Sequence, residues 1–177
     1  MAIRDILQYP DPRLRTPAKR VDAIDERVKA LINDMFETMY DAPGIGLAAT
    51  QIDVHEQIVV MDISETGDQP QVLINPEIIT RDETCDIAEE GCLSIVGYAD
   101  NVERPIAVTV RGLDAEGAAF EQRFEGLHAR CIQHELDHLE GRLFIDHLSA
   151  LKRNRLRRRF EKAARQRGEP PLKTGAV

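Results

Sequence analysis

Residues 131–141, CIQHELDHLEG, place two histidines and a glutamate within little more than one helical turn. His134 and His138 are four residues apart, so on a helix both side chains project from one face and can reach a single metal ion. Glu135 directly follows the first histidine, where its carboxylate can take a proton from water at the metal without being a ligand itself. This stretch therefore predicts a metal-binding helix around which the rest of the fold is arranged.

The helix should cover residues 127–140, because Gly141 occupies the position at which helices favour glycine. Four apolar residues near the side of the histidines predict that the helix is buried: Leu127, Cys131, Ile132 and Leu139. Buried histidines need polar partners, and Gln133 and Asp137 are placed to support them. The alternative is a surface helix with two unrelated histidines, because the HExxH pattern also occurs by chance.

The rest of the chain predicts an α+β fold, with small antiparallel sheets packed around the metal-binding helix and a helix near each end. Apolar residues between residues 21 and 39 recur at helical spacing and predict the N-terminal helix. The β-rich runs are QIVVMDIS (57–64), QVLINPEII (71–79), CLSI (92–95), IAVTVRGL (106–113) and AAFEQRFEG (118–126), the last two joined by the hairpin turn DAEG (114–117). The C-terminal helix should cover residues 150–167. Residues 1–20 predict a Pro-rich arm on the surface, and residues 168–177 a frayed tail.

The composition indicates one soluble domain: the chain has 177 residues, of which 42% are hydrophobic and 31% charged. No apolar run approaches the roughly 18 residues that span a bilayer, and the N-terminus lacks the apolar segment of a secretory signal. Three cysteines without an export signal favour a reducing cytosol over a disulfide framework. We expect Cys85 and Cys131 to be small buried hydrophobes.

The net charge of −8 is unevenly distributed along the chain. Residues 148–167 contain nine Lys or Arg and one acidic residue, a local charge of +8, so the remainder carries −16. Such a patch favours polyanions, although a charge run is more often a solvated helix face. The helix has only a thin apolar stripe, formed by Leu148, Leu151, Leu156 and Phe160. The chain therefore has a catalytic part, residues 1–148, and a basic C-terminal helix and tail, residues 149–177, which either belongs to the same domain or is an appendage.

Two histidines need a third ligand. In an HExxH endopeptidase the third ligand is usually a downstream Glu or His, but His147 lies beyond the helix end and should cap or face solvent, while Glu161 lies within the basic run. Upstream, Cys92 follows Gly91, and a glycine allows close approach of the backbone. A thiolate with two imidazoles gives three ligands and an open fourth position for water. This donor set counts against the endopeptidase interpretation.

Three segments together resemble the signature blocks of the peptide deformylases: GIGLAATQ (44–51), EGCLS (90–94) and QHELDHLEG (133–141). They occur in that family's order and with similar separations, and the resemblance runs over nearly the whole chain, from ILQYPDPRLR to LFIDHLS. The resemblance implies an α+β hydrolase that removes the formyl group from the N-terminal formyl-methionine of new proteins. It also implies one divalent metal ion, Fe²⁺ first, which Zn²⁺, Ni²⁺ or Co²⁺ can replace.

The resemblance assigns a role to each matching residue of this chain. The metal ligands would be Cys92, His134 and His138. Glu135 would act as general base and then as general acid. Two groups would donate hydrogen bonds to the developing oxyanion, the side-chain amide of Gln51 and the backbone N–H of Leu93. The substrate-binding residues would be Ile45 and Gly46 for the peptide backbone, and Glu90, Leu127, Arg130 and Cys131 around the side-chain pocket.

Two positions depart from the family pattern. Val96 follows EGCLSI where most relatives have Pro, and Arg130 occupies a position that is usually apolar and lines the methionine pocket. Arg130 could point to solvent over apolar neighbours or change the side-chain preference. From their charges, Glu90 and Arg104 could pair and brace the EGCLS segment.

The partners follow from the same resemblance. We expect nascent formyl-methionyl peptides as substrates, docking of the basic C-terminal helix on the ribosome near the tunnel exit, no membrane contact, and a cytoplasmic monomer. A non-catalytic ribosome-binding module is another hypothesis, but it leaves the four residues Cys92, His134, Glu135 and His138 unexplained.

Overall fold

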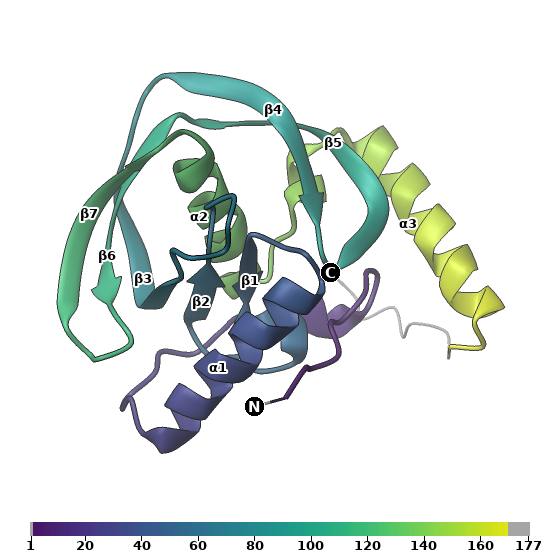
Figure 1. The fold of residues 1–177 in the computed structure, drawn as a ribbon. Helices are drawn as coiled ribbons and strands as arrows, with labels where there is room; N and C mark the ends of the chain where they lie inside the picture. The colour runs from purple at the N-terminus through teal and green to yellow at the C-terminus, as the bar shows by residue number, and fades with distance from the viewer. Residues whose placement is uncertain (1, 170–177) are drawn as a thin grey trace.

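The chain folds around one helix, α2 (Gly126–Leu139), which Figure 1 shows in the middle of the molecule. The computed structural model describes residues 2–169. The other helices are α1 (Glu26–Asp41) and α3 (Ala150–Gln166), with short 3₁₀ helices at Pro12–Arg15, Ala49–Ile52 and Phe144–His147. The strands are β1 (Gly46–Ala48), β2 (Ile58–Met61), β3 (Gln71–Arg81), β4 (Cys85–Cys92), β5 (Ile95–Pro105), β6 (Ala107–Leu113) and β7 (Ala119–Glu125). The predicted α+β architecture with a central helix is confirmed.

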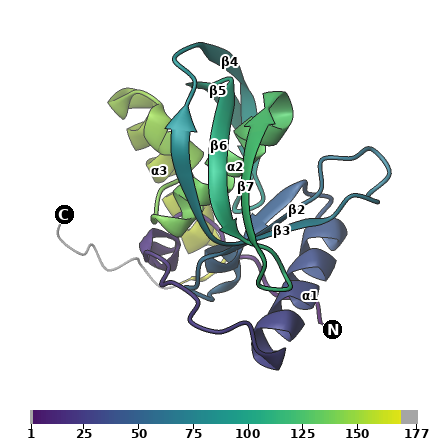
Figure 2. The same cartoon turned by 90° about the vertical axis from the view of Figure 1, so that its left-hand side faces the viewer.

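All strand pairs are antiparallel, and they form two separate sheets among the described residues. The larger sheet has the order β1-β2-β3-β6-β7, and the smaller consists of β4 and β5. Figure 2 shows β3, β6 and β7 in front of α2, and Figure 1 shows the β4–β5 hairpin passing over this helix. The central helix is therefore enclosed from two sides, and the hairpin is a separate unit that must be held to it.

Strand β2 explains why a continuous apolar run, rather than an alternating one, is found here. Ile58 and Val60 pack in a cluster with residues of α1, while Val59 and Met61 pack in a cluster with residues of α2. Both faces of the strand are buried, so every position is apolar. The sheet is thus sandwiched between α1 and α2, and this packing fixes β1, the next strand, at the edge nearest the histidines.

The structure corrects three sequence-based predictions: a helix boundary, a strand and the burial of a cysteine. The N-terminal helix begins at Glu26, where the Asp25 side chain accepts a hydrogen bond from the Val28 N–H, so residues 21–24 precede the helix. CLSI is not a strand, because Leu93 and Ser94 form the turn between β4 and β5. Cys85 is exposed rather than buried.

The N-terminal arm is only partly a surface segment. Its residues Leu7, Tyr9 and Leu14 are buried in one cluster with Phe144 and Leu156. The arm therefore belongs to the core of the protein, which corrects the expectation that it lies on the surface.

Helix α3 lies on the outer side of the β4–β5 hairpin (Figure 1) and has nearly the predicted bounds. Leu156 is buried and Phe160 packs edge-on to Tyr9, with ring centroids 5.6 Å apart. Leu151, however, is 62% exposed, so the expected apolar stripe is shorter than predicted. The expected frayed tail, except for residues 168 and 169, lies outside the described residues. Among those described, no helix combines the length and apolar character needed to cross a membrane.

Candidate metal and catalytic site

The side chains of Cys92, His134 and His138 converge on one point. One possible ligand atom from each lies within 4.8 Å of the others, and the Sγ of Cys92 is 3.3 Å from Nε2 of His138. The two histidines come from one face of α2, and the cysteine is the last residue of β4. The thiolate is a soft donor and the imidazoles are borderline donors. Three such ligands leave the fourth position of a tetrahedral metal ion open for water. The predicted triad is therefore assembled, and it could bind one metal ion.

The tautomer of His134 is fixed by Glu90. The Nδ1 of His134 donates to a carboxylate oxygen of Glu90 at 2.9 Å, which leaves Nε2 of the ring facing the triad. Arg104 binds both oxygens of the same carboxylate, at 2.6 and 2.9 Å, so the predicted Glu90–Arg104 pair is confirmed. Burial alone would raise the pKa of Glu90, but these hydrogen bonds and the charge of Arg104 lower it to about 2. Glu90 thus supports the ligand His134.

His138 is also prepared to act as a neutral ligand. Burial lowers its pKa well below the usual value, and the neighbouring His134 lowers it further. Among the described residues, its Nδ1 is buried without a hydrogen-bond partner. A ring that is kept neutral can offer a lone pair to a metal.

Glu135 lies beside the triad and is 4% exposed. Burial raises the pKa of this carboxyl to about 7, and its Oε2 has no hydrogen-bond partner among the described residues. Gly46 of β1 makes room for it: a Cβ at that position would lie 2.6 Å from Oε1 of Glu135 and 2.8 Å from Sγ of Cys131. Glycine is therefore required where the edge strand passes the carboxylate.

Gln51 and Leu93 approach the triad from two different segments. The side-chain amide of Gln51 donates to Oγ of Ser94 at 3.1 Å and lies 3.7 Å from Sγ of Cys92. Its carbonyl oxygen accepts from the Ala48 N–H at 2.9 Å, so the amide orientation is fixed. Leu93 follows the cysteine in the turn of the hairpin. Both predicted hydrogen-bond donors are thus next to the cysteine.

A cavity of about 430 Å³ opens in front of this group. Its walls include the predicted substrate residues Ile45, Gly46, Glu90, Leu127, Arg130 and Cys131. Leu127 is 55% exposed and stands at the opening, so the expectation that it helps to bury α2 is wrong. Gly91 also lines the cavity, but a Cβ there would meet nothing nearer than 3.9 Å. The glycine before the cysteine is therefore not needed for close approach.

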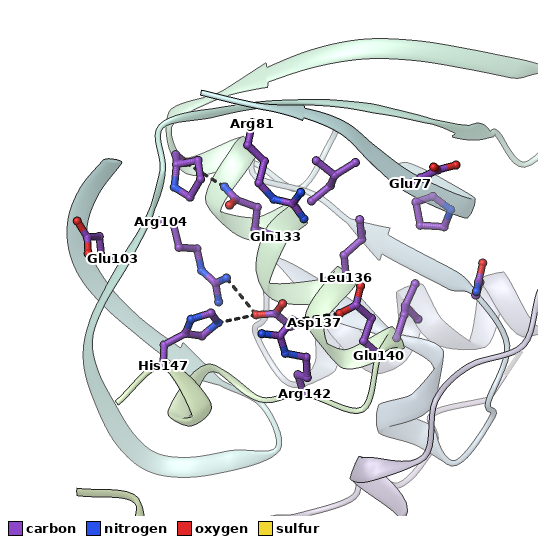
Figure 3. Close-up of a pocket in the computed structure, with 15 residues that line it drawn as sticks. Glu77, Arg81, Glu103, Arg104, Gln133, Leu136, Asp137, Glu140, Arg142 and His147 are labelled. Carbon is purple, nitrogen blue, oxygen red and sulfur yellow. Dashed lines mark hydrogen bonds and ion pairs between the residues drawn. The ribbon is translucent and has the colours of Figure 1, made fainter. Parts of the chain in front are cut away.

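The other polar residues of α2 point away from the triad. Figure 3 shows a second pocket, of about 360 Å³, in which Arg104 and His147 converge on Asp137. Arg104 donates to this carboxylate at 3.0 Å, and Nε2 of His147 lies 2.9 Å from it. Gln133 donates to the carbonyls of Ala129 and Pro105. Gln133 and Asp137 therefore do not contact the ligands, although Asp137 supports Glu90 indirectly through Arg104.

The downstream alternatives for the third ligand are excluded by position. His147 is exposed, as expected, and its Nε2 lies 2.9 Å from Asp137, while Glu161 on α3 pairs with Arg157 at 2.7 Å. Neither belongs to the group of ligand atoms around Cys92. The arrangement therefore lacks the ligand set expected of an HExxH endopeptidase.

Comparison with known proteins agrees with this geometry. Residues 3–154 match the family model described as polypeptide deformylase. The chain belongs to the polypeptide deformylase family. It is 58% identical over 166 residues to the peptide deformylase of Pseudomonas aeruginosa, which covers 94% of this chain and 99% of the relative. The members of this family are enzymes, so the chain is an enzyme as well.

Solved structures of the family have the same fold. The peptide deformylase of Legionella pneumophila is 50% identical and superimposes with a TM-score of 0.86 over 96% of this chain and 100% of that one. That of Ehrlichia chaffeensis in complex with actinonin is 37% identical, with a TM-score of 0.89 over 93% of this chain and 99% of that one.

Two residues near the site were missed by sequence reasoning. Ser94 accepts from Gln51, and its backbone N–H lies 3.4 Å from Sγ of Cys92. Gln8 of the N-terminal arm donates to the carbonyl of Leu93 at 2.9 Å. The serine could have been suspected from its place in EGCLS, but nothing in the local sequence of the arm indicates a contact 85 residues away.

Proposed function

We propose that this protein is a metal-dependent hydrolase that removes the formyl group from the N-terminal formyl-methionine of nascent proteins. The observation that carries the proposal is the convergence of Cys92, His134 and His138 beside the buried carboxylate of Glu135. A thiolate and two imidazoles that can hold a metal ion, with a carboxylate beside them as a base, suit the hydrolysis of a formamide. Membership of the deformylase family identifies the acyl group that is removed.

The metal is proposed to be Fe²⁺, with Zn²⁺, Ni²⁺ or Co²⁺ able to replace it, because a mixed Cys and His donor set accepts each of these ions. When bound, the ion would act as a Lewis acid and lower the pKa of water in its open position. His134 and His138 would hold it from one helix, and Cys92 from the hairpin. The buried negative charge of Glu90 increases the basicity of His134 as a ligand.

The protein's own proton carrier is proposed to be Glu135. Its burial keeps the carboxyl pKa near the pH at which it works, so it can both accept and return a proton. It would take a proton from the attacking water and deliver it to the amine that leaves when the C–N bond of the formamide breaks. Glu135 is held next to the strand edge by Gly46 and is shielded from bulk water.

The oxyanion of the tetrahedral intermediate is proposed to lie between the Gln51 amide and the Leu93 N–H. Support comes from the position of Gln51, whose carbonyl is held by Ala48 while its NH₂ points toward Cys92. A donor that is oriented before the reaction stabilises developing charge without further reorganisation.

The substrate backbone is proposed to extend the five-stranded sheet at β1. This strand is an edge of the sheet, so one side of Ile45 and Gly46 can pair with an extended peptide. The methionine side chain would enter the cavity lined by Leu127, Cys131 and the aliphatic part of Arg130.

The deciding experiment measures metal content and formate release together. Protein purified without oxygen should contain about one metal ion per chain and release formate from formyl-Met-Ala-Ser. Glu135→Ala should keep its metal and lose roughly 10²–10⁴-fold in turnover, the usual contribution of a general base. Undiminished turnover in this variant would refute the assigned base, and absence of formate release by the wild type would refute the function.

We further propose that residues 149–177 form a basic appendage that docks on ribosomal RNA near the tunnel exit. Within the described residues, four cations of α3 have no ion pair, cation–π contact or side-chain hydrogen bond: Arg155, Arg158, Lys162 and Arg165. Unpaired cations along one helix suit a phosphate backbone.

The docking test should neutralise charge without removing the buried anchor Leu156. A variant with Arg155, Arg158 and Lys162 changed to Ala should lose salt-sensitive co-sedimentation with ribosomes and keep its activity on a short formyl peptide. The control changes Lys19, Arg20 and Arg81 to Ala, which are exposed cations elsewhere and alter the net charge equally. Equal co-sedimentation of the two variants with ribosomes would refute the docking proposal. A cytoplasmic monomer is the proposed working state, which light scattering on the purified protein would test.

A further inference from the structure

Arg130 is buried although it carries a charge and lies on the wall of the cavity. It is 7% exposed, and its guanidinium donates to four acceptors. These are Oε2 of Glu90 at 2.7 Å, the carbonyl of Val102 at 2.9 Å, and Oδ1 and the carbonyl of Asp86 at 2.6 and 3.2 Å. The alternative that Arg130 points to solvent is therefore wrong.

The acceptors of Arg130 all belong to the β4–β5 hairpin. Asp86 and Glu90 lie on β4, and Val102 lies on β5, whereas Arg130 itself lies on α2 one turn before His134. The planar fork of a guanidinium can hold several acceptors at once in a fixed geometry. Arg130 thus fastens the separate two-stranded sheet to the central helix.

The same contacts determine where the metal ligands meet. His134 and His138 are fixed relative to each other by helix geometry, but Cys92 is at the end of β4, two residues after Glu90. Any rotation of the hairpin on the helix would therefore change the distance between the thiolate and both imidazoles. Arg130 also binds the carboxylate oxygen of Glu90 that His134 does not use.

We propose that Arg130 is a positioning residue for the metal site. Its guanidinium holds the hairpin that carries Cys92 against the helix that carries both histidines, and it fixes the Glu90 carboxylate that orients His134. The guanidinium is bound by these acceptors of the hairpin, and Arg130 also lines the cavity. This inference rests on the proposed metal site and assigns a support to it that Arg104 alone does not provide, because Arg104 lies on β5 of the hairpin itself and its side chain hydrogen-bonds to α2 only at Asp137 among the described residues.

The test measures Co²⁺ binding to the metal-free chain by competition with a chelator. Visible absorption reports the coordination geometry, and the near-ultraviolet thiolate band reports the bond to Cys92. Arg130→Met keeps the stem and removes the fork, and it should weaken binding by roughly 10–100-fold and diminish the thiolate band. The control is Arg153→Met, which removes a partly buried arginine that binds two backbone carbonyls away from the site.

A double-mutant cycle with Glu90→Gln separates positioning from general loosening of the fold. If Arg130 acts through the Glu90 carboxylate, Arg130→Met should weaken Co²⁺ binding by less than about threefold when Glu90→Gln is already present. In steady-state assays Arg130→Met should lower kcat and leave KM for a formyl-methionyl peptide within about threefold, because the stem still lines the pocket.

If Arg130→Met does not fold, Arg130→Lys tests the positioning role instead. Lysine keeps the charge but cannot join Asp86, Glu90 and Val102 at once, so Co²⁺ binding should weaken by at least about fivefold. Wild-type affinity and spectrum in a folded Met or Lys variant would overturn the positioning role, and equal losses in both Glu90 backgrounds would overturn the part of it that acts through the Glu90 carboxylate. Absence of Co²⁺ binding by the wild-type chain would instead refute the metal site itself.

Discussion

Replacing Gly46 with alanine tests whether the edge strand and the proton-carrying carboxylate share the same space. The new Cβ would lie 2.6 Å from Oε1 of Glu135 and 2.8 Å from Sγ of Cys131. Ordinary contacts begin at 3.4 Å, so the carboxylate must move by about 0.8 Å. Both neighbours are buried and have little free volume to occupy.

A displacement of this size should lower kcat/KM strongly and the free energy of unfolding only modestly. A misplacement of about 1 Å in a reacting group costs on the order of 10²-fold, so kcat/KM of Gly46→Ala should fall about 100-fold, or roughly 2.7 kcal/mol. The loss should be in kcat, because the carboxylate acts in the transition state. Overpacking costs about 1–3 kcal/mol in unfolding free energy, so the variant should still fold and keep its metal.

The assay is formate release from a formyl-methionyl peptide, with metal content and urea unfolding measured on the same samples. Gly91→Ala is the matched control, because a Cβ there meets nothing nearer than 3.9 Å although the residue adjoins Cys92. Gly91→Ala should retain activity within about threefold, since a substitution without a steric or polar conflict changes little. Wild-type kcat in Gly46→Ala, or an equal loss in both variants, would refute the reasoning.

Three further changes test the support of the site. Leu156→Ala should lower the unfolding free energy in urea by about 2–5 kcal/mol, whereas the exposed Leu151→Ala should change it by less than about 0.5; equal effects would contradict the packing of α3. Adding Co²⁺ at about 1,000 times its Kd should stabilise the metal-free chain by about 4 kcal/mol, and Cys92→Ala should abolish that gain; a persistent gain would place the ion elsewhere. Ser94→Ala should reduce kcat less than Gln51→Ala does, because Ala48 still holds the Gln51 carbonyl; a larger loss in Ser94→Ala would give the serine its own role.

The central helix was predictable because the residues that define it are close together in the sequence. Helical spacing alone brings His134 and His138 to one face, and Gly141 marks the end of the helix. The fully apolar run of β2 also predicts its burial. Donor chemistry made Cys92 a candidate for the third ligand, and the match to a family block assigned it, since 42 residues separate it from His134 and no periodic pattern connects them.

The β4–β5 hairpin was missed for a physical reason. Most residues of β4 are exposed or half-buried, and only Glu90 is buried, so the strand has no alternating apolar face. It pairs with a single neighbour, and the hairpin is attached to α2 by ion pairs, among them Arg130–Asp86 and Arg104–Asp137, instead of by apolar packing. Propensity and periodicity detect burial of hydrophobic surface, and neither detects a strand of this kind.

Arg130 shows the same limit in a single side chain. A cation in an amphipathic helix is expected at the surface, and burial becomes acceptable only when enough acceptors surround it. Here Asp86 and the Val102 carbonyl, 44 and 28 residues away, supply part of them. No reading of residues near position 130 could have found these partners.

The position of Cys92 relative to the two histidines therefore depends on the contacts that hold the hairpin, and these come from two sides. On one side Glu90 connects it to α2 through its ion pair with Arg130 and its contact with His134. On the other side the N-terminal arm binds its turn: Gln8 donates to the Leu93 carbonyl, and the Tyr9 N–H donates to the Ser94 carbonyl at 2.7 Å. Because these residues follow the cysteine directly, the arm and the ion pairs together fix the thiolate. A segment that sequence alone would treat as a surface extension is thus part of what positions the metal ligand.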